Sequence, residues 1–97
     1  MFSRLFSGSK RHLSSLSEQE VLALAISCEE DDGRIYQAYG QILKQKYPDS
    51  AKVFEDMAEV ENTHKNMLID MHRRRFGERI PLIRREHVNG FLTRRPD

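Results

Sequence analysis

The sequence predicts an all-α fold, an antiparallel two-helix hairpin with a short C-terminal helix. Two long segments combine good helical composition with apolar residues at every third or fourth position. The break between them, at residues 47–50, is short, and a short connection makes neighbouring helices antiparallel. A hairpin of a 97-residue chain leaves one apolar face uncovered. We therefore expect a partner copy or further sequence to cover this face; two copies paired as a dimer would form a four-helix bundle.

Residues 1–16 form the first of three expected regions, a flexible N-terminal tail. They are rich in serine and basic residues and contain few bulky apolar side chains. A short amphipathic contact with a membrane or a partner is the alternative for this segment. The segment lacks the apolar stretch of a secretory signal, and no run in the chain is long enough to span a bilayer.

The second region, residues 17–77, is the helical hairpin. Ser17 and Glu20 have the spacing of a capping box, which predicts the start of the first helix, and the helix should continue to about Lys46. Its inner stripe is apolar except near the middle, and two glycines on or beside it indicate close approach of another helix. The stripe consists of Leu22, Ala25, Ile26, Glu29, Asp32, Gly33, Tyr36, Gly40 and Leu43.

The second helix is expected from about Ala51 to Phe76. Asp49 or Ser50 can cap its start, and Gly77 is placed to stop it. Its inner stripe is also apolar apart from its middle, and consists of Val53, Phe54, Met57, Val60, Glu61, His64, Met67, Leu68 and Met71.

The third region, residues 78–97, is basic, with a break at Pro81 and a turn or short helix at residues 84–91. Residues 1–64 carry 7 Lys and Arg against 11 Asp and Glu, whereas residues 65–97 carry 9 against 4. The arginine clusters lack the interleaved aromatic residues of a nucleic-acid interface, so we expect no nucleic-acid partner. A helix C-terminus or an anionic membrane surface explains them better.

Three polar side chains lie in the middle of the two stripes: Glu29 on the first helix, and Glu61 and His64 on the second. A buried carboxylate is unfavourable unless a cation or hydrogen bonds meet it. Glu61 and His64 are three residues apart and so share one side of their helix. Mid-helix residues of an antiparallel pair meet at similar height. The pattern indicates a metal site, with a metal-free Glu–His core pair as the alternative; iron or manganese suits these ligands, and zinc is also compatible.

Three runs of this sequence resemble rubrerythrin-type ferritin-like proteins. The runs are residues 25–36, 57–64 and 76–85. In that family the first ligand helix carries a Glu seven residues before a Tyr, here Glu29 and Tyr36. The second carries Glu-x-x-His, here Glu61 and His64. The third run resembles the bacterial membrane-bound ferritins, in which such a domain precedes a membrane domain similar to vacuolar iron transporters.

The resemblance implies a ferritin-like four-helix bundle whose two hairpins share a di-iron site, a layout also found in encapsulated ferritins. It makes Glu29 and Glu61 bridging or chelating ligands and His64 a terminal one. Tyr36 would hydrogen-bond to the ligands. Asp32 stands where the family usually has a small residue; it is either an accessory metal ligand or a helix-surface acid, and we favour the second.

The resemblance also implies ferroxidase chemistry, the oxidation of Fe(II) by dioxygen or peroxide, in iron storage, detoxification or delivery to an exporter. A non-catalytic helical dimerisation module that regulates an iron transporter is the alternative. In membrane-bound ferritins a second ligand-helix pair and the membrane domain follow, so we expect this chain to be part of such a protein. With a single cysteine, Cys28, the chain fits a reducing compartment, and we expect it in the cytoplasm, at the inner face of a membrane. The remaining histidines, His12, His72 and His87, are expected at the surface or in local packing.

Overall fold

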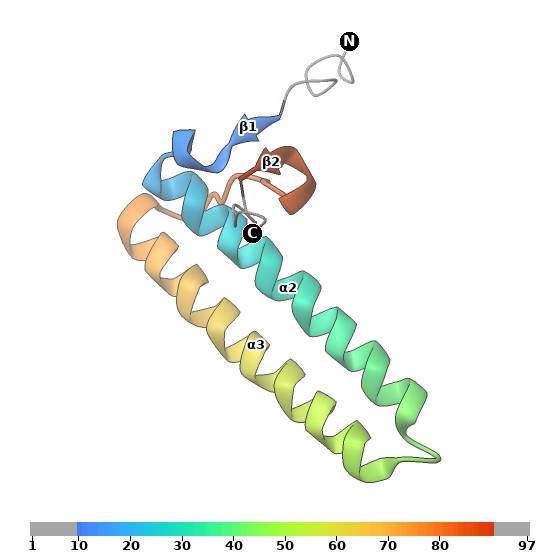
Figure 1. Cartoon of the computed structure of the whole chain (residues 1–97). Coiled ribbons are helices and arrows are strands. Elements are labelled where there is room, and N and C mark those ends of the chain that lie inside the picture. The colour runs from blue at the N-terminus through green and yellow to red at the C-terminus, as the bar shows by residue number, and fades with distance from the viewer. Residues whose placement is uncertain (1–9, 91–97) are drawn as a thin grey trace.

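The computed structural model describes residues 10–90 and shows a long α-helical hairpin with a small cap of irregular structure at one end (Figure 1). Helix α2 spans Glu18–Leu43, and helix α3 spans Pro48–Phe76 and packs antiparallel against it. The short elements are β1 (Arg11–His12), η1 (Leu13–Ser15), η2 (Arg85–His87) and β2 (Val88–Asn89). The predicted all-α hairpin is confirmed. Within residues 10–90, neither helix is both long and apolar enough to cross a membrane.

Helix α2 begins at the expected capping box. The Ser17 hydroxyl accepts a hydrogen bond from the Glu20 backbone N–H at 3.2 Å, and Glu20 Oε1 accepts one from the Ser17 N–H at 2.9 Å. Both bonds satisfy backbone donors that the first turn of a helix leaves unpaired. The helix ends at Leu43, slightly earlier than expected, because residues 44–46 form a turn.

Helix α3 begins earlier than the sequence suggested. Pro48 lies in its first turn, where a missing backbone N–H is not needed by the helix. Tyr47 occupies the N-cap position and its side chain makes no capping hydrogen bond, so the expectation that Asp49 or Ser50 caps this helix was wrong. The helix ends at Gly77, as expected, with a φ of 95° that favours glycine.

Small residues form the contact between the two helices. Gly40 is buried, and a Cβ at this position would lie 3.2 Å from Glu55 Cγ and 3.4 Å from the Ala51 carbonyl oxygen. Ala51 and Ala58 are also buried. The close approach expected from the glycine pattern is therefore present at Gly40, where even a methyl group would be tightly packed.

The larger apolar residues of α3 are divided between the helix contact and solvent: Phe54 packs against Tyr36 and Tyr39 of α2, whereas a row of Val and Met side chains is exposed. We call this row the open face; its exposed members on α3 are Val53, Met57, Val60, Met67 and Met71. The stripe expected on this helix is thus mostly exposed, and the small residues that contact α2, Ala51 and Ala58, lie outside it. A contiguous exposed apolar row of this kind is typical of a surface that another chain covers.

His72 is fully buried at the N-terminal end of α2. Its Nδ1 lies 3.1 Å from the Gly77 carbonyl oxygen and must donate, so Nε2 accepts from the Gln19 side-chain amide at 3.3 Å. Its ring contacts Phe76 at 5.5 Å between centroids. His72 is therefore a packing residue and not a surface one, and it joins the start of α2 to the end of α3.

The two ends of the described chain meet beside the start of α2 (Figure 1). Strands β1 and β2 pair in parallel, with Arg11 opposite Val88. Arg11 Nη1 lies 2.7 Å from Glu20 Oε2, and Ser27 Oγ donates to the Ile83 carbonyl oxygen at 2.7 Å. We call this arrangement the clasp.

The clasp joins one segment that was expected to be a flexible tail to another that was expected to be a short helix or turn. Residues 11–15, part of the expected flexible tail, have regular secondary structure and side-chain contacts. The expected helix or turn at residues 84–91 is a 3₁₀ turn at Arg85–His87 followed by strand β2. The rest of the expected tail, residues 1–9, and residues 91–97 lie outside the described part of the chain.

Candidate metal centre

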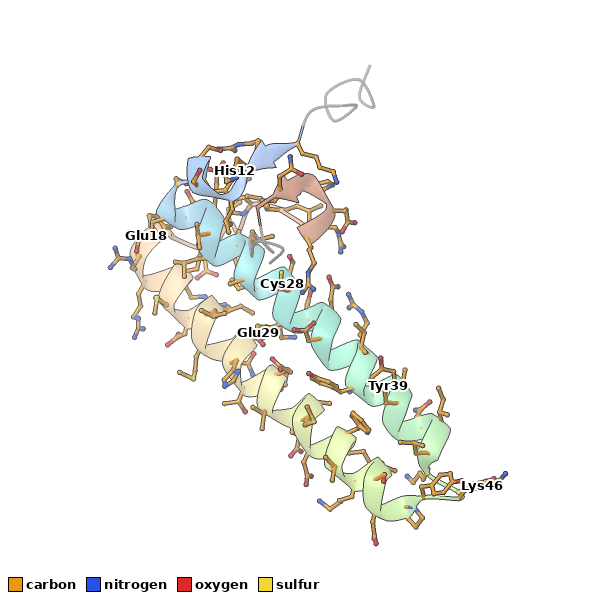
Figure 2. The ribbon with its side chains drawn as sticks, viewed as in Figure 1. His12, Glu18, Cys28, Glu29, Tyr39 and Lys46 are labelled. Carbon is orange, nitrogen blue, oxygen red and sulfur yellow. The ribbon has the colours of Figure 1, made fainter. Side chains whose placement is uncertain are left out.

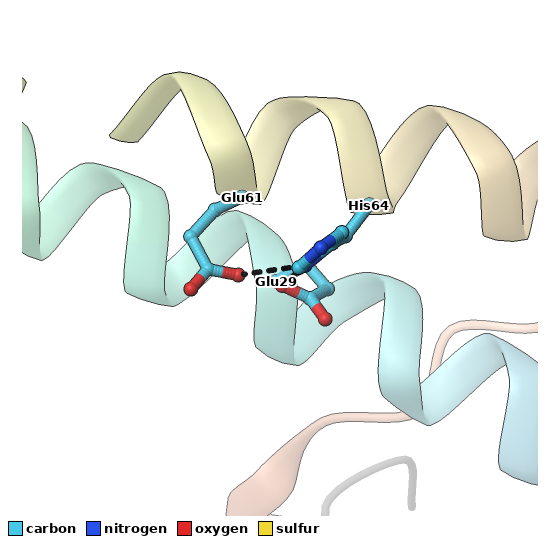
Figure 3. A group of neighbouring side chains, drawn as sticks. All are labelled: Glu29, Glu61 and His64. Atoms are coloured by element: carbon cyan, nitrogen blue, oxygen red, sulfur yellow. Dashed lines mark ion pairs between the residues drawn. The ribbon is translucent and has the colours of Figure 1, made fainter. Parts of the chain in front are cut away.

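Glu29, Glu61 and His64 come together (Figure 3), and Glu29 lies about midway along the hairpin (Figure 2). Glu29 comes from α2 and the other two from adjacent turns of α3. His64 Nδ1 lies 3.8 Å from Glu61 Oε1 and 3.9 Å from Glu29 Oε1. Each side chain offers one oxygen or nitrogen atom, and these atoms all lie within 4.8 Å of one another. The antiparallel arrangement of two mid-helix positions accounts for this convergence.

The spacing of these atoms matches ligands around an ion better than direct hydrogen bonds. A hydrogen bond between nitrogen and oxygen spans about 2.7–3.2 Å, which is shorter than both separations from His64. Oxygen and nitrogen ligands about 2.1 Å from a shared cation lie about 3 to 4.2 Å apart, depending on the angle at the ion. The two separations fall within this interval.

One carboxylate oxygen in this group is buried without a partner. Glu29 Oε1 is inaccessible to solvent and makes no hydrogen bond. The side chains of Glu29 and Glu61 are 24% and 19% exposed, whereas that of His64 is 51% exposed. A buried acceptor without a donor is unfavourable by about 1–3 kcal/mol, more for a charged group. The donor set and the unpaired oxygen therefore fit a bound cation.

The charges near the group favour a cation as well. Among residues 10–90, no lysine or arginine forms an ion pair with Glu29 or Glu61. An ion pair between the two helices adjoins the group in sequence: Lys65 Nζ lies 3.7 Å from Glu30 Oε2. This pair was not predicted from the sequence. Lys65 and Glu30 each follow a site residue directly in the sequence, but neighbouring residues on a helix point in different directions, so this position did not indicate that they pair.

Asp32 lies outside this group. Its Oδ1 is 3.5 Å from Arg85 Nη2, and this arginine also contacts Cys28. Cys28 first, and then Asp32, raise the pKa of the Arg85 guanidinium above its usual value. The pairing agrees with the preferred interpretation of Asp32 as a helix-surface acid, and its role as an accessory ligand stays a prediction.

Tyr36 packs in the layer next to the group. Its ring is stacked on Phe54, with centroids 6.1 Å apart and planes inclined by 27°. Phe54 also meets Tyr39 edge-on at 5.2 Å. Phe54 of α3 thus contacts two tyrosine rings of α2 on the loop side of the site. The expected hydrogen bond of Tyr36 to the ligands stays a prediction.

Two hollows adjoin the group, and Glu29 is the one residue that lines both of them. The apolar hollow, of about 360 Å³, lies on the open face and is lined by Glu29, His64, Met67, Leu68, Asp70, Met71 and Arg74. The polar hollow, of about 210 Å³, is lined by Glu29, Glu30, Gly33, Arg34, Gln37, Ala58, Asn62 and Lys65. The site can therefore be approached from a lipophilic side and from a hydrophilic one.

Comparison with known proteins gives one match. The model of a protein family described as Rubrerythrin matches residues 20–97, which include all of α3, nearly all of α2 and the three side chains of the group. No curated protein and no solved structure matches the chain.

Proposed function

The chain belongs to the rubrerythrin family of ferritin-like, iron-binding proteins, and on that basis we propose that its dimer forms a di-iron ferroxidase site. The observation that carries the proposal is the buried, unpaired Oε1 of Glu29 beside Glu61 and His64. One hairpin offers two carboxylates and one imidazole. Two hairpins would offer four and two, the ligand set of a di-iron carboxylate site in a four-helix bundle.

The carboxylates, the imidazole and the tyrosine of the site would have different roles. Glu29 and Glu61 would bridge or chelate the metal, and their negative charge would favour Fe(III) over Fe(II). His64 would be a terminal ligand, and Tyr36 would steady the carboxylates. Iron bound there would supply the electrons that reduce dioxygen or peroxide. Manganese or zinc would fit the same donors.

The open face supports pairing with a second copy. It contains the row of exposed Val and Met residues, and half-exposed His64 lies among them. A second hairpin laid against this row would remove the apolar side chains from water, and it would enclose His64 and the two carboxylates. Dimerisation would then both bury the apolar row and bring together the ligands of the di-iron site. Homodimers or larger homo-oligomers are the proposed partners.

The assay for this proposal is Fe(II) oxidation by the purified chain under air. We expect Glu29→Gln to abolish catalysed oxidation, because the amide removes the charge that holds the cation while keeping the shape. Glu59→Gln, on the exposed side of α3, is the matched control and should oxidise iron like the wild type. Equal rates in all three proteins would contradict the proposal.

The alternative is a non-catalytic dimerisation or regulatory module of an iron transporter. The same open face favours it, because a helical pair can associate without any metal. A chain that dimerises and leaves Fe(II) oxidation at the uncatalysed rate would select this alternative. Linkage to a membrane iron-transport domain and a location in the cytoplasm at the inner face of a membrane are proposed in both cases.

A further inference from the structure

A dimer formed through the open face would restrict access to the metal site, so this inference rests on the proposed function. The second copy would cover the apolar hollow beside His64 and Met67. A hydrated divalent cation cannot cross such a surface without losing its water, which is strongly unfavourable. Iron must therefore reach the buried carboxylates by another side of the hairpin.

The polar hollow shares only Glu29 with the apolar hollow, so a partner on the open face would leave its other lining residues uncovered. Beside Glu29, the amide side chains of Asn62 and Gln37 also line it. Gly33 has no side chain and leaves this part of the hollow open. A Cβ at this position would lie 3.8 Å from Glu61 Cβ. The hollow thus leads from solvent to the same carboxylate that lies at the metal group.

A single cross-helix ion pair lies across this hollow. Lys65 Nζ of α3 is 3.7 Å from Glu30 Oε2 of α2, and their side chains are 24% and 46% exposed. Arg34 is already paired with Asp31 at 2.8 Å, so it contributes little net charge. A long, partly exposed pair of this kind is weak and opens readily. Once it opens, Glu30 presents a free carboxylate beside amide oxygens, the hard donors that hydrated divalent cations prefer.

We propose that the polar hollow is the access route of hydrated divalent cations to Glu29, and that the Lys65–Glu30 pair is its gate. Lys65 closes the route by repelling cations and neutralising Glu30. Glu30 attracts the cation when the pair opens. Neither residue is a ligand of the final site, so their effect is on the rate of loading and not on the amount of metal bound.

The test is the rate of Co(II) uptake by the full chain, followed by stopped-flow absorbance, with bound Co(II) counted at equilibrium. Lys65→Met should load about fivefold faster than wild type, and Glu30→Gln about fivefold slower, the effect of one unit charge at short range in a largely solvated path. Gly33→Leu should slow loading by filling the hollow. All three should reach the wild-type Co(II) count.

Lys44→Met is the matched control. Lys44 also forms a cross-helix pair, at 3.9 Å from Glu55, but at the far end of the hairpin. It should load at the wild-type rate. Wild-type rates in Lys65→Met and Glu30→Gln, with normal Co(II) counts, would overturn the route and leave the proposed function standing. A changed Co(II) count in Lys65→Met would also overturn it, by placing Lys65 in the site itself. Absence of bound Co(II) in the wild type would overturn both.

Discussion

Glu29 and Glu61 bring two carboxylates together with only one imidazole between them. Without a cation this arrangement opposes folding, because like charges repel and Glu29 Oε1 has no donor. With a cation the same atoms become ligands. At the scale of single residues, the two carboxylates therefore lower the stability of the metal-free chain and raise its affinity for a metal ion.

This conflict predicts opposite effects of one substitution on the two forms. Glu61→Gln should raise the free energy of unfolding of the metal-free protein by about 0.5 kcal/mol, since it removes a like charge. Wild type should gain about 2.7 kcal/mol from Mn(II) at a hundred times its dissociation constant, and the variant should gain almost nothing. Urea unfolding with and without Mn(II) measures both. A metal-free variant less stable than wild type would mean that Glu61 and His64 form a structural pair.

The convergence of these three side chains could be anticipated because their helices were long, periodic and joined by a short turn. The burial of His72 could not be anticipated. Its burial depends on the chain reversal at Gly77 and on Gln19, which is 53 residues away. Neither partner has a local signature in the sequence. The same limit applied to the Lys65–Glu30 pair, which two different helices bring together.

At the scale of elements, the distance between α2 and α3 is set by small residues rather than by the bulky ones. A Cβ at Gly40 would come within 3.2 Å of Glu55, whereas one at Gly33 would meet nothing closer than 3.8 Å. The two glycines share a helix and a periodicity, so sequence alone treats them alike. Only the packed pair distinguishes the close contact from the open one.

That difference predicts opposite signs for two glycine substitutions. Gly33→Ala should raise the free energy of unfolding by about 0.5–1 kcal/mol, because alanine favours the helix and its Cβ fits. Gly40→Val should lower it by about 1–3 kcal/mol, because the side chain overfills a buried contact. Urea denaturation followed by far-UV circular dichroism measures both changes. Stabilisation by both substitutions would mean that the helices are not in close contact at Gly40.

The apolar pattern predicted the helices but not how each stripe is used. Periodicity identifies a face, and it does not say whether that face meets the other helix or a further chain. Val53 and Met57 lie on the expected stripe of α3 and are exposed, while Ala51 and Ala58 make the contact with α2. Small residues were the better indication of the contact, because close approach of two helices requires them.

At the scale of the whole molecule, the clasp joins the two ends of the described chain and anchors the start of α2. The clasp could not be predicted from the sequence, since two strands of two residues each have no detectable periodicity. Its strongest polar contact is between Arg11 and Glu20. The hydrogen bond from Arg11, followed by that from the Ser17 backbone, lowers the pKa of Glu20 from 4.5 to about 2.

This lowered pKa predicts how the clasp responds to acid. A carboxyl group whose pKa falls on folding stabilises the protein above its unfolded pKa and loses that effect as the pH falls through the folded one. The contribution of Glu20 should therefore be full above pH 4.5 and disappear towards pH 2. Glu20→Gln should show a shallower loss of stability across this interval in low salt. Equal slopes for both proteins would contradict the assigned contact.

The open face has the largest consequence for the molecule as a whole. Exposed Val and Met residues surround a half-exposed ligand candidate, so association and metal binding should depend on the same surface. A charge placed there should disrupt both. Met57→Glu, on the open face, should yield a monomer with weakened metal binding, whereas Met57→Leu should behave like wild type; gel filtration and metal counting would detect the difference.

Native mass spectrometry of the chain, with and without anaerobic Fe(II), tests the central claim most directly. We predict a dimer that carries two iron ions, and a Glu61→Ala dimer that carries none. A wild-type dimer without iron would contradict the shared di-iron site and leave Glu29, Glu61 and His64 with a packing role alone.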